Sequence, residues 1–165
     1  MQVHSLTDTT TQLATIREWH EEGRVRYVGV TTSNTSQHGE MGWIMRGEAL
    51  DFVQVNYSLA DRGAAERLLP SAADRGIAVT ANLPFGRGRL LRALAGWPLP
   101  DWTRDFDCES WSQFLLKYII SHPAVTCAVP GTTQERHVVD NFGAAVGRLP
   151  NASLRRRQEE LFDAF

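Results

Sequence analysis

The residues best suited to chemistry surround a turn between Pro130 and Thr133. An apolar run at 125–129 precedes the turn and predicts a strand that is buried on both faces. After the turn, apolar residues recur at helical spacing at Val138, Val139, Phe142 and Val146. The expected order is strand, tight turn and helix N-terminus, where free backbone N–H groups bind anions. An ordinary connection without a ligand is the alternative explanation of the same pattern.

The composition suits a single soluble domain over residues 1–165. The chain has 42% hydrophobic and 22% charged residues, which is enough apolar material for a sizeable core. Its formal net charge is −2, so no polyanionic partner is indicated. The cluster Arg155–Arg157 is followed by Glu159, Glu160 and Asp163, which favours a solvated helix face over a nucleic-acid patch.

Cysteine and metal patterns exclude several classes of protein. The two cysteines, Cys108 and Cys127, are too few for a disulfide scaffold, and Cys127 in its apolar run is expected to be a reduced core residue. No HExxH or paired CxxC motif is present, so no metal site is predicted. The absence of a long apolar run and of a signal-peptide pattern predicts a cytoplasmic protein without a membrane partner.

Strand and helix patterns alternate along the whole chain. Strands are predicted at 1–6, 27–31, 51–57, 77–81 and 125–129, and helices at 11–22, 40–46, 60–75, 110–121 and 152–162. Gly23 and Gly76 each end a helix shortly before a strand, whereas 82–102 is expected to be a long irregular excursion. This alternation predicts an α/β fold with a parallel sheet, either a barrel or an open doubly wound sheet. About five strands are few for a closed barrel of roughly 250 residues.

Four strings resemble the aldo/keto reductase superfamily in their order and spacing: GRVRYVGV, DFVQVNYSLADR, ANLPFGRGRLL and AVPGTTQERHVVDN. The resemblance extends over nearly the whole chain. It implies a partial (β/α)8 TIM barrel, with NADP or NAD lying across the carboxyl ends of the strands. The activity it implies is hydride transfer between the nicotinamide and a small aldehyde or ketone substrate.

The string QVHSL resembles the end of the family's fourth strand. His4 there matches the catalytic histidine that orients the substrate carbonyl. The family's catalytic Asp, proton-donating Tyr and Lys belong to earlier strands, and no matching strands precede Met1 in this sequence. The resemblance therefore implies the C-terminal half of a barrel, from strand four onward.

The resemblance also implies cofactor-binding residues. Thr31 and Thr32 fall where the family has Ser-Asn against the nicotinamide carboxamide, and Gln54 matches a glutamine that binds the same group. Asn82 falls where many members stack a Tyr on the nicotinamide ring, so the aromatic platform is replaced by an amide. The loop that wraps the pyrophosphate is matched by Leu83, Pro84, Phe85, Gly86 and Arg87.

The adenosine end of the cofactor is matched less well. Gly131 and His137 replace a Lys and an Arg that typically bind the 2′-phosphate, which removes the usual charge-assisted contacts. Arg136 could partly replace the lost charge. The remaining positions of the phosphate turn and of the adenine contacts are matched by Thr132, Thr133, Asp140 and Asn141.

Two functions fit these observations. The first is an aldo/keto reductase-like oxidoreductase that needs a complementing N-terminal half or a second copy. The second is a repurposed half-barrel with a binding or non-redox role, such as a cyclisation or isomerisation. Because half a barrel has two open sheet edges, we expect a homodimer or other homo-oligomer. The sheet valines are expected to be partly uncovered, namely Val28, Val30, Val53, Val55 and Val79.

Overall fold

The computed structural model describes all 165 residues and contains one parallel sheet of five strands in the order β1-β2-β3-β4-β5. The strands are β1 (Gln2–Val3), β2 (Gly29–Thr31), β3 (Phe52–Asn56), β4 (Ala78–Asn82) and β5 (Cys127–Ala128). Neighbouring strands in the sheet are also successive in the chain, as in a (β/α) barrel. The predicted fold class, a partial barrel of about five parallel strands, is confirmed.

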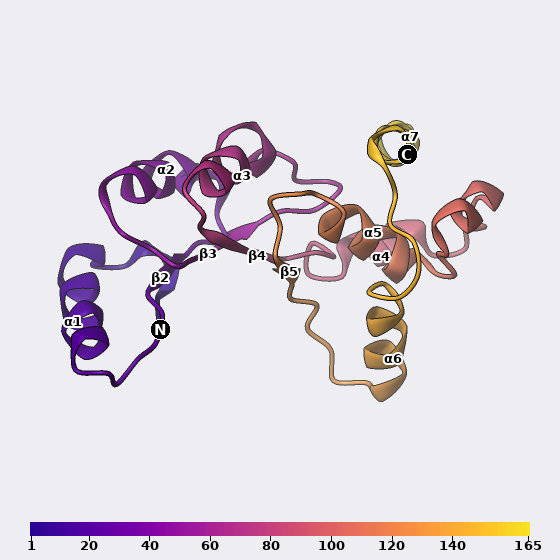
Figure 1. Cartoon of the computed structure of the whole chain (residues 1–165). Coiled ribbons are helices and arrows are strands. Elements are labelled where there is room, and N and C mark those ends of the chain that lie inside the picture. The colour runs from indigo at the N-terminus through magenta and orange to yellow at the C-terminus, as the bar shows by residue number, and fades with distance from the viewer.

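Helices follow every strand. They are α1 (Thr9–Glu21), α2 (His38–Gly47), α3 (Ala64–Asp74), α4 (Arg89–Leu94), α5 (Trp111–Ile120), α6 (Glu135–Gly143) and α7 (Ala152–Asp163). Three short 3-10 segments are η1 (His4–Leu6), η2 (Thr35–Gln37) and η3 (Asp101–Phe106). In Figure 1 the sheet runs across the molecule, α2 and α3 lie on one side of it, and α6 extends away on the other. No helix combines the length and apolar character needed to cross a membrane.

The core lies between the sheet and the helices α2 and α3. Val30, Val53, Val55 and Val79 are essentially inaccessible to solvent and share one cluster with Met41 and Met45 of α2 and Leu68 and Leu69 of α3. The expectation that the sheet valines are partly uncovered is wrong, because they face these helices. The alternate residues, including Phe52, Gln54, Ala78 and Thr80, point to the opposite face and are half-buried.

Two predicted helix ends are confirmed. Gly23 and Gly76 follow α1 and α3 with φ of +74° and +67°, in the left-handed region where glycine is favoured. Helix α3 begins at Ala64, later than the predicted start at residue 60. The region 82–102 is not wholly irregular, because Leu90 and Leu94 are buried and belong to a short helix, α4.

The prediction for 125–129 is wrong in extent and in burial. Only Cys127 and Ala128 form a strand, and Cys127 is exposed rather than part of the core. The reason is the face that Cys127 occupies, since it pairs in register with Thr80, whose side chain points away from α2 and α3, and β5 has no strand on its other side. The open side also leaves apolar residues of α6 exposed.

Helix α7 is fixed to α5 by buried polar groups. Gln158 donates from Nε2 to the carbonyl of Phe114 over 2.9 Å. The Tyr118 hydroxyl donates to Glu159 over 2.5 Å, and Arg155 donates to the Tyr57 hydroxyl over 2.9 Å. Burial raises the pKa of Tyr118 above its ordinary value. Tyr57 is fully buried in this contact.

Candidate cofactor site

Because the strands are parallel, their carboxyl ends form one rim, and the site residues expected from sequence follow these ends. Thr31 pairs with Gln54 in register, and Asn56 pairs with Asn82. His4 follows β1 directly, in η1 rather than in a strand, and is exposed. In barrel enzymes this rim carries the active site, so the sheet places the expected residues where ligands bind.

Backbone and side-chain bonds bring together the residues expected at the nicotinamide end. The backbone N–H of Thr32 donates to the carbonyl of Gln54 over 2.9 Å, and Asn82 donates from Nδ2 to the carbonyl of Thr32 over 2.9 Å. The Thr31 hydroxyl accepts from the N–H of Ser5 over 3.1 Å. The Gln54 side chain is half-buried and its carboxamide stays available to a ligand. Thr32, Gln54 and Asn82 therefore form one cluster at the rim.

Asn82 also carries an unsatisfied group. Its Oδ1 is buried and accepts no hydrogen bond. An orphaned buried acceptor costs about 1–3 kcal/mol of stability. The Oε1 of Gln158, in the contact between α5 and α7, is unsatisfied in the same way, so the Asn82 oxygen does not by itself mark a ligand site.

The loop after β4 has an unusual backbone. Leu83, Gly86, Arg87 and Gly88 all have positive φ, between 53° and 80°. The N–H groups of Arg87 and Gly88 bond to no backbone carbonyl. Successive N–H groups in such conformations form a concave surface that binds anions. The loop therefore presents free N–H groups suited to an anion.

The turn after β5 offers a second set of donors. The Thr132 hydroxyl accepts from the N–H of Gln134 over 3.2 Å and lies 3.3 Å from Nδ1 of His137. Glu135 and Arg136, in the first turn of α6, have N–H groups without a backbone acceptor. The turn and the helix N-terminus exist as predicted, and both are exposed.

A cavity of about 360 Å³ joins the loop and the turn. Its walls carry one cationic side chain, that of Arg87, and no acidic side chain, so an anionic ligand is favoured. Residues expected from sequence that line it are Leu83, Pro84, Phe85, Arg87, Gly131, Thr132, His137 and Asn141. The sequence analysis missed Gly88, Leu91, Ser112 and Val129. Gly88 lies in the quoted string ANLPFGRGRLL and could have been found, whereas Ser112 on α5 has no local signal.

Other expected residues lie outside this cavity. Asp140 faces α5, where its carboxylate accepts from the Ser110 hydroxyl over 2.8 Å and from Gln113 Nε2 over 2.9 Å. Gly86 and Thr133 belong to the loop and the turn without lining the cavity. Arg136 donates from Nε to the Gln134 side chain over 3.0 Å and does not line the cavity either.

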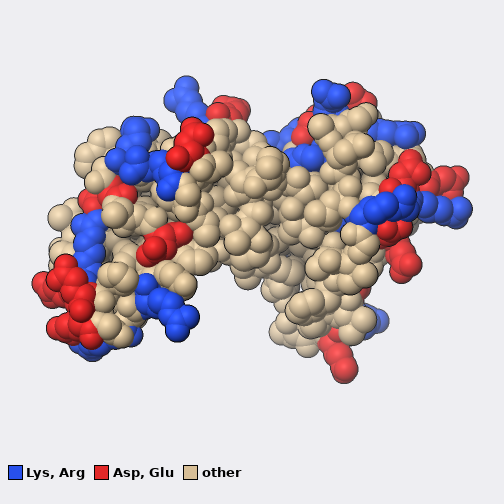
Figure 2. Space-filling view, in the orientation of Figure 1, with Lys and Arg blue, Asp and Glu red and all other residues tan.

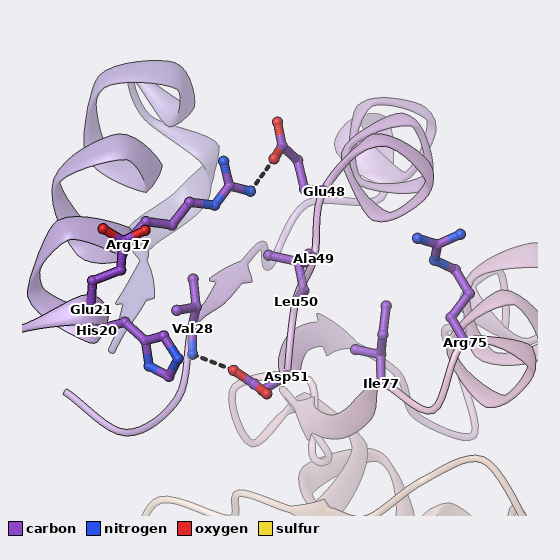
Figure 3. Close-up of a pocket in the computed structure, with 10 residues that line it drawn as sticks. All are labelled: Arg17, His20, Glu21, Val28, Glu48, Ala49, Leu50, Asp51, Arg75 and Ile77. Atoms are coloured by element: carbon purple, nitrogen blue, oxygen red, sulfur yellow. Dashed lines mark hydrogen bonds and ion pairs between the residues drawn. The ribbon is translucent and has the colours of Figure 1, made fainter. Parts of the chain in front are cut away.

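A different cavity, of about 520 Å³, lies at the opposite ends of the strands (Figure 3). Its walls include Val28, Asp51 and Ile77, each just before a strand. Arg17 pairs with Glu48 across its upper edge, and Asp51 accepts from the N–H of Val28 over 2.8 Å. This end of a (β/α) barrel serves stability rather than chemistry, so we assign the candidate site to the carboxyl ends.

Five parallel strands joined by helices, with the anion-suited cavity at their carboxyl ends, define a protein of the (β/α)-barrel class. The profile of the Aldo/keto reductase family matches residues 1–159. The chain therefore belongs to the aldo/keto reductase family.

Solved structures agree with this assignment. An aldo-keto reductase from Bacillus halodurans, in its holo form, superposes with a TM-score of 0.73 and 21% identity over 97% of this chain and 59% of its own. An aldo/keto reductase from Klebsiella pneumoniae in complex with NADP and acetate gives 0.74 and 25%, over 98% of this chain and 57% of its own. At 21% identity, the similarity to the Bacillus halodurans structure shows the fold alone.

A curated relative matches a shorter stretch. The NADH-specific methylglyoxal reductase of Escherichia coli (strain K12) is 33% identical over 78 residues, which are 47% of this chain and 23% of that protein. The chain thus spans less than two thirds of each of these relatives.

Proposed function

We propose that the chain is the cofactor-binding half of an NAD(P)-dependent oxidoreductase that acts on small aldehydes or ketones. The observation that carries the proposal is the cavity between the Leu83–Gly88 loop and the Thr132 turn, whose only charged side chain is the cation Arg87. The proposal includes a cytoplasmic location and a partner, either a second copy or an N-terminal half, that completes the barrel.

The residues fit a nicotinamide dinucleotide in three parts. Thr31, Thr32 and Gln54 would hold the carboxamide, with Asn82 beside them. The free N–H groups of Arg87 and Gly88 would bind the pyrophosphate, and the first turn of α6 would face the adenosine end. When bound, the cofactor supplies the hydride that reduces a carbonyl carbon.

His4 would orient the substrate. It is exposed at the end of β1, on the same rim as Thr31 and Gln54. Its imidazole can donate a hydrogen bond to a carbonyl oxygen. No tyrosine lies free at the rim, because Tyr57 is buried against α5 and Tyr27 precedes β2. Because a second copy would carry the same tyrosines, the proton donor would come from an N-terminal half.

Calorimetric titration with NADH and NADPH tests the proposal. We expect weak binding and affinities within about tenfold of each other, because Gly131 and His137 replace the usual cations at the 2′-phosphate. Arg87→Ala and Gln54→Ala should each weaken binding, whereas Arg67→Ala, at an exposed position of α3, removes the same charge without effect. Sub-micromolar NADPH binding with NADH about a hundredfold weaker would contradict the assignment of the adenosine end.

Turnover assays separate the two candidate functions. We expect the chain alone to consume NADH or NADPH with aldehydes far below about 1 s⁻¹, since positioned proton transfer alone contributes about 10²–10⁴-fold. Turnover at about 1 s⁻¹ that His4→Ala abolishes would show that the chain is catalytically complete. Dinucleotide binding that never supports reduction, even with an N-terminal half supplied, would favour the repurposed half-barrel.

A further inference from the structure

The segment that follows β1 has an unfavourable backbone. Ser5, Leu6 and Asp8 have φ of 54°, 53° and 44°, in the left-handed region that residues with a Cβ seldom adopt. Such conformations persist where contacts from the surrounding structure hold them. Because His4 belongs to this segment, the contacts that hold the segment also fix the position of the histidine.

Uncharged groups supply these contacts. Figure 2 shows charged side chains gathered over the two ends of the molecule, whereas the surface over its middle is mostly uncharged. None of the five ion pairs of the chain involves residues 4–8 or 31–37. The geometry of this part of the rim therefore depends on hydrogen bonds between neutral groups.

Two side chains bond to the backbone of Ser5. Its N–H donates to the Thr31 hydroxyl over 3.1 Å, and Gln37 donates from Nε2 to its carbonyl over 3.2 Å. Gln37 is the last residue of η2 and lies 32 positions from Ser5, so no local pattern identifies it. The bond from Gln37 ties the His4 segment to the loop after β2.

The carbonyl end of the Gln37 side chain bonds to the rim cluster that contains Thr32. Its Oε1 accepts from the Thr32 hydroxyl over 2.6 Å, and Thr32 is only 1% exposed. A rotated amide would turn its own oxygen toward the Ser5 carbonyl oxygen, so only the observed orientation makes both bonds. One half-buried side chain therefore connects the His4 segment to Thr32.

We propose that Gln37 is a positioning residue that keeps His4 in register with the nicotinamide end of the cofactor. This inference rests on the proposed function, in which His4 orients the carbonyl and Thr32 lies against the carboxamide. Hydride transfer needs the carbonyl carbon close to the nicotinamide, and a displacement of about 1 Å can cost about 10²-fold in rate. The two bonds use both polar atoms of the Gln37 side chain, so it acts through Ser5 and Thr32.

Two substitutions of similar size separate these two bonds. Gln37→Glu keeps an oxygen for the Thr32 hydroxyl but loses the donor to the Ser5 carbonyl, whereas Gln37→Met loses both bonds. Gln12→Glu is the matched control. Gln12 donates from Nε2 to the carbonyl of Thr7 over 2.8 Å, so it holds the same segment from α1 without a bond to Thr32. Circular dichroism checks that all three variants fold.

Hydrogen exchange of the Ser5 amide, followed by NMR without ligand, tests whether Gln37 holds the segment. We expect exchange to be at least about fivefold faster in Gln37→Glu and Gln37→Met, which is the effect of about one lost hydrogen bond. Equal exchange in the wild-type chain and in Gln37→Glu overturns the proposal.

The same measurement at saturating NADH tests the connection to the cofactor. We expect NADH to slow exchange at Ser5 at least about threefold in the wild-type chain and in Gln12→Glu, and to leave it unchanged in Gln37→Glu. Gln37→Met should also weaken NADH binding, because Thr32 loses its partner. If Gln12→Glu and Gln37→Glu respond alike, Gln37 has a structural role only and the positioning role is overturned.

The wild-type chain distinguishes failure of this inference from failure of the proposed function. NADH binding without slower exchange at Ser5 overturns the positioning role and leaves the proposed function standing. Absence of NADH binding overturns the proposed function and the positioning role with it. The exchange measured without ligand still decides, in that case, whether Gln37 holds Ser5.

Discussion

The centre of the sheet and its β5 edge differ in how completely their apolar side chains are covered. Val53 and Val55 of β3, with strands on both sides and α2 and α3 above, are inaccessible to solvent. Around β5, which has a neighbour on one side only, Val129 and Phe142 remain largely exposed. The open side of β5 therefore goes with exposed apolar side chains, whereas Val3 of the other edge strand, β1, is inaccessible to solvent.

The largest loss of stability should come from a substitution in the covered core of the sheet. Val55→Asp places an unpaired charge in the core and should cost more than about 4 kcal/mol, enough to unfold the chain. Val139→Asp on α6, where the side chain is 69% exposed, should change stability by less than about 0.5 kcal/mol. Urea denaturation followed by circular dichroism measures both. Equal destabilisation would show that α6 is covered in the monomer.

A smaller effect is expected at the anchor of the α6–α7 connection. Lys117 is fully buried on α5 and donates from Nζ to the carbonyls of Val146 and Arg148 over 2.7 and 2.9 Å. Burial lowers its pKa below the ordinary value. Lys117→Met leaves both carbonyls without this donor and should cost about 1–3 kcal/mol in urea denaturation. Arg156→Met, at an exposed position of α7, is the control and should be neutral.

The contact between α5 and α6 should contribute less. Ser110 caps α5 by accepting from the N–H of Gln113 over 3.1 Å, and it donates to Asp140 of α6. Ser110→Ala should cost about 1 kcal/mol and increase hydrogen exchange in α6 more than in α2. Ser153→Ala, on the exposed side of α7, serves as the control. Unchanged exchange in α6 would mean that other contacts hold this helix.

The smallest effect is a pH dependence. The hydrogen bonds from Arg148 hold the pKa of Asp107 below its ordinary value. A carboxyl with a lowered folded-state pKa stabilises the fold above the unfolded pKa of about 3.9, and this stability is lost as the pH falls toward the folded value. Asp107→Asn should therefore lower Tm at pH 7 more than at pH 3. An equal loss at both pH values would exclude a contribution from this titration.

The sequence predicted the fold where burial is complete. Apolar runs and helix-ending glycines identified β3, β4, α1 and α3 because their periodicity reflects a closed core. The same reasoning failed at β5, since an apolar run does not reveal whether a neighbouring strand covers it. Cys127 was assigned to the core for that reason and is exposed.

The site was predicted unevenly. Residues 83–87 and the Thr132 turn are each a run of adjacent residues that the sequence reveals directly. Most of these residues line one cavity in the structure. The bond from Asn82 to the Thr32 carbonyl spans 50 positions of sequence and has no local pattern. Asp140 was expected at the adenosine end, and its contacts to Ser110 and Gln113 depend on how α5 and α6 pack.

The contrast between the two cysteines has a practical use in chemical labelling. Cys108 is buried, and burial raises its pKa to about 12, so its thiol stays protonated and slow to react. Cys127 is exposed at the sheet edge. An alkylating fluorophore should therefore modify Cys127 almost alone, without any engineered site. The rate at which the fluorophore alkylates Cys127 then reports how often the flank of β5 is accessible to solvent.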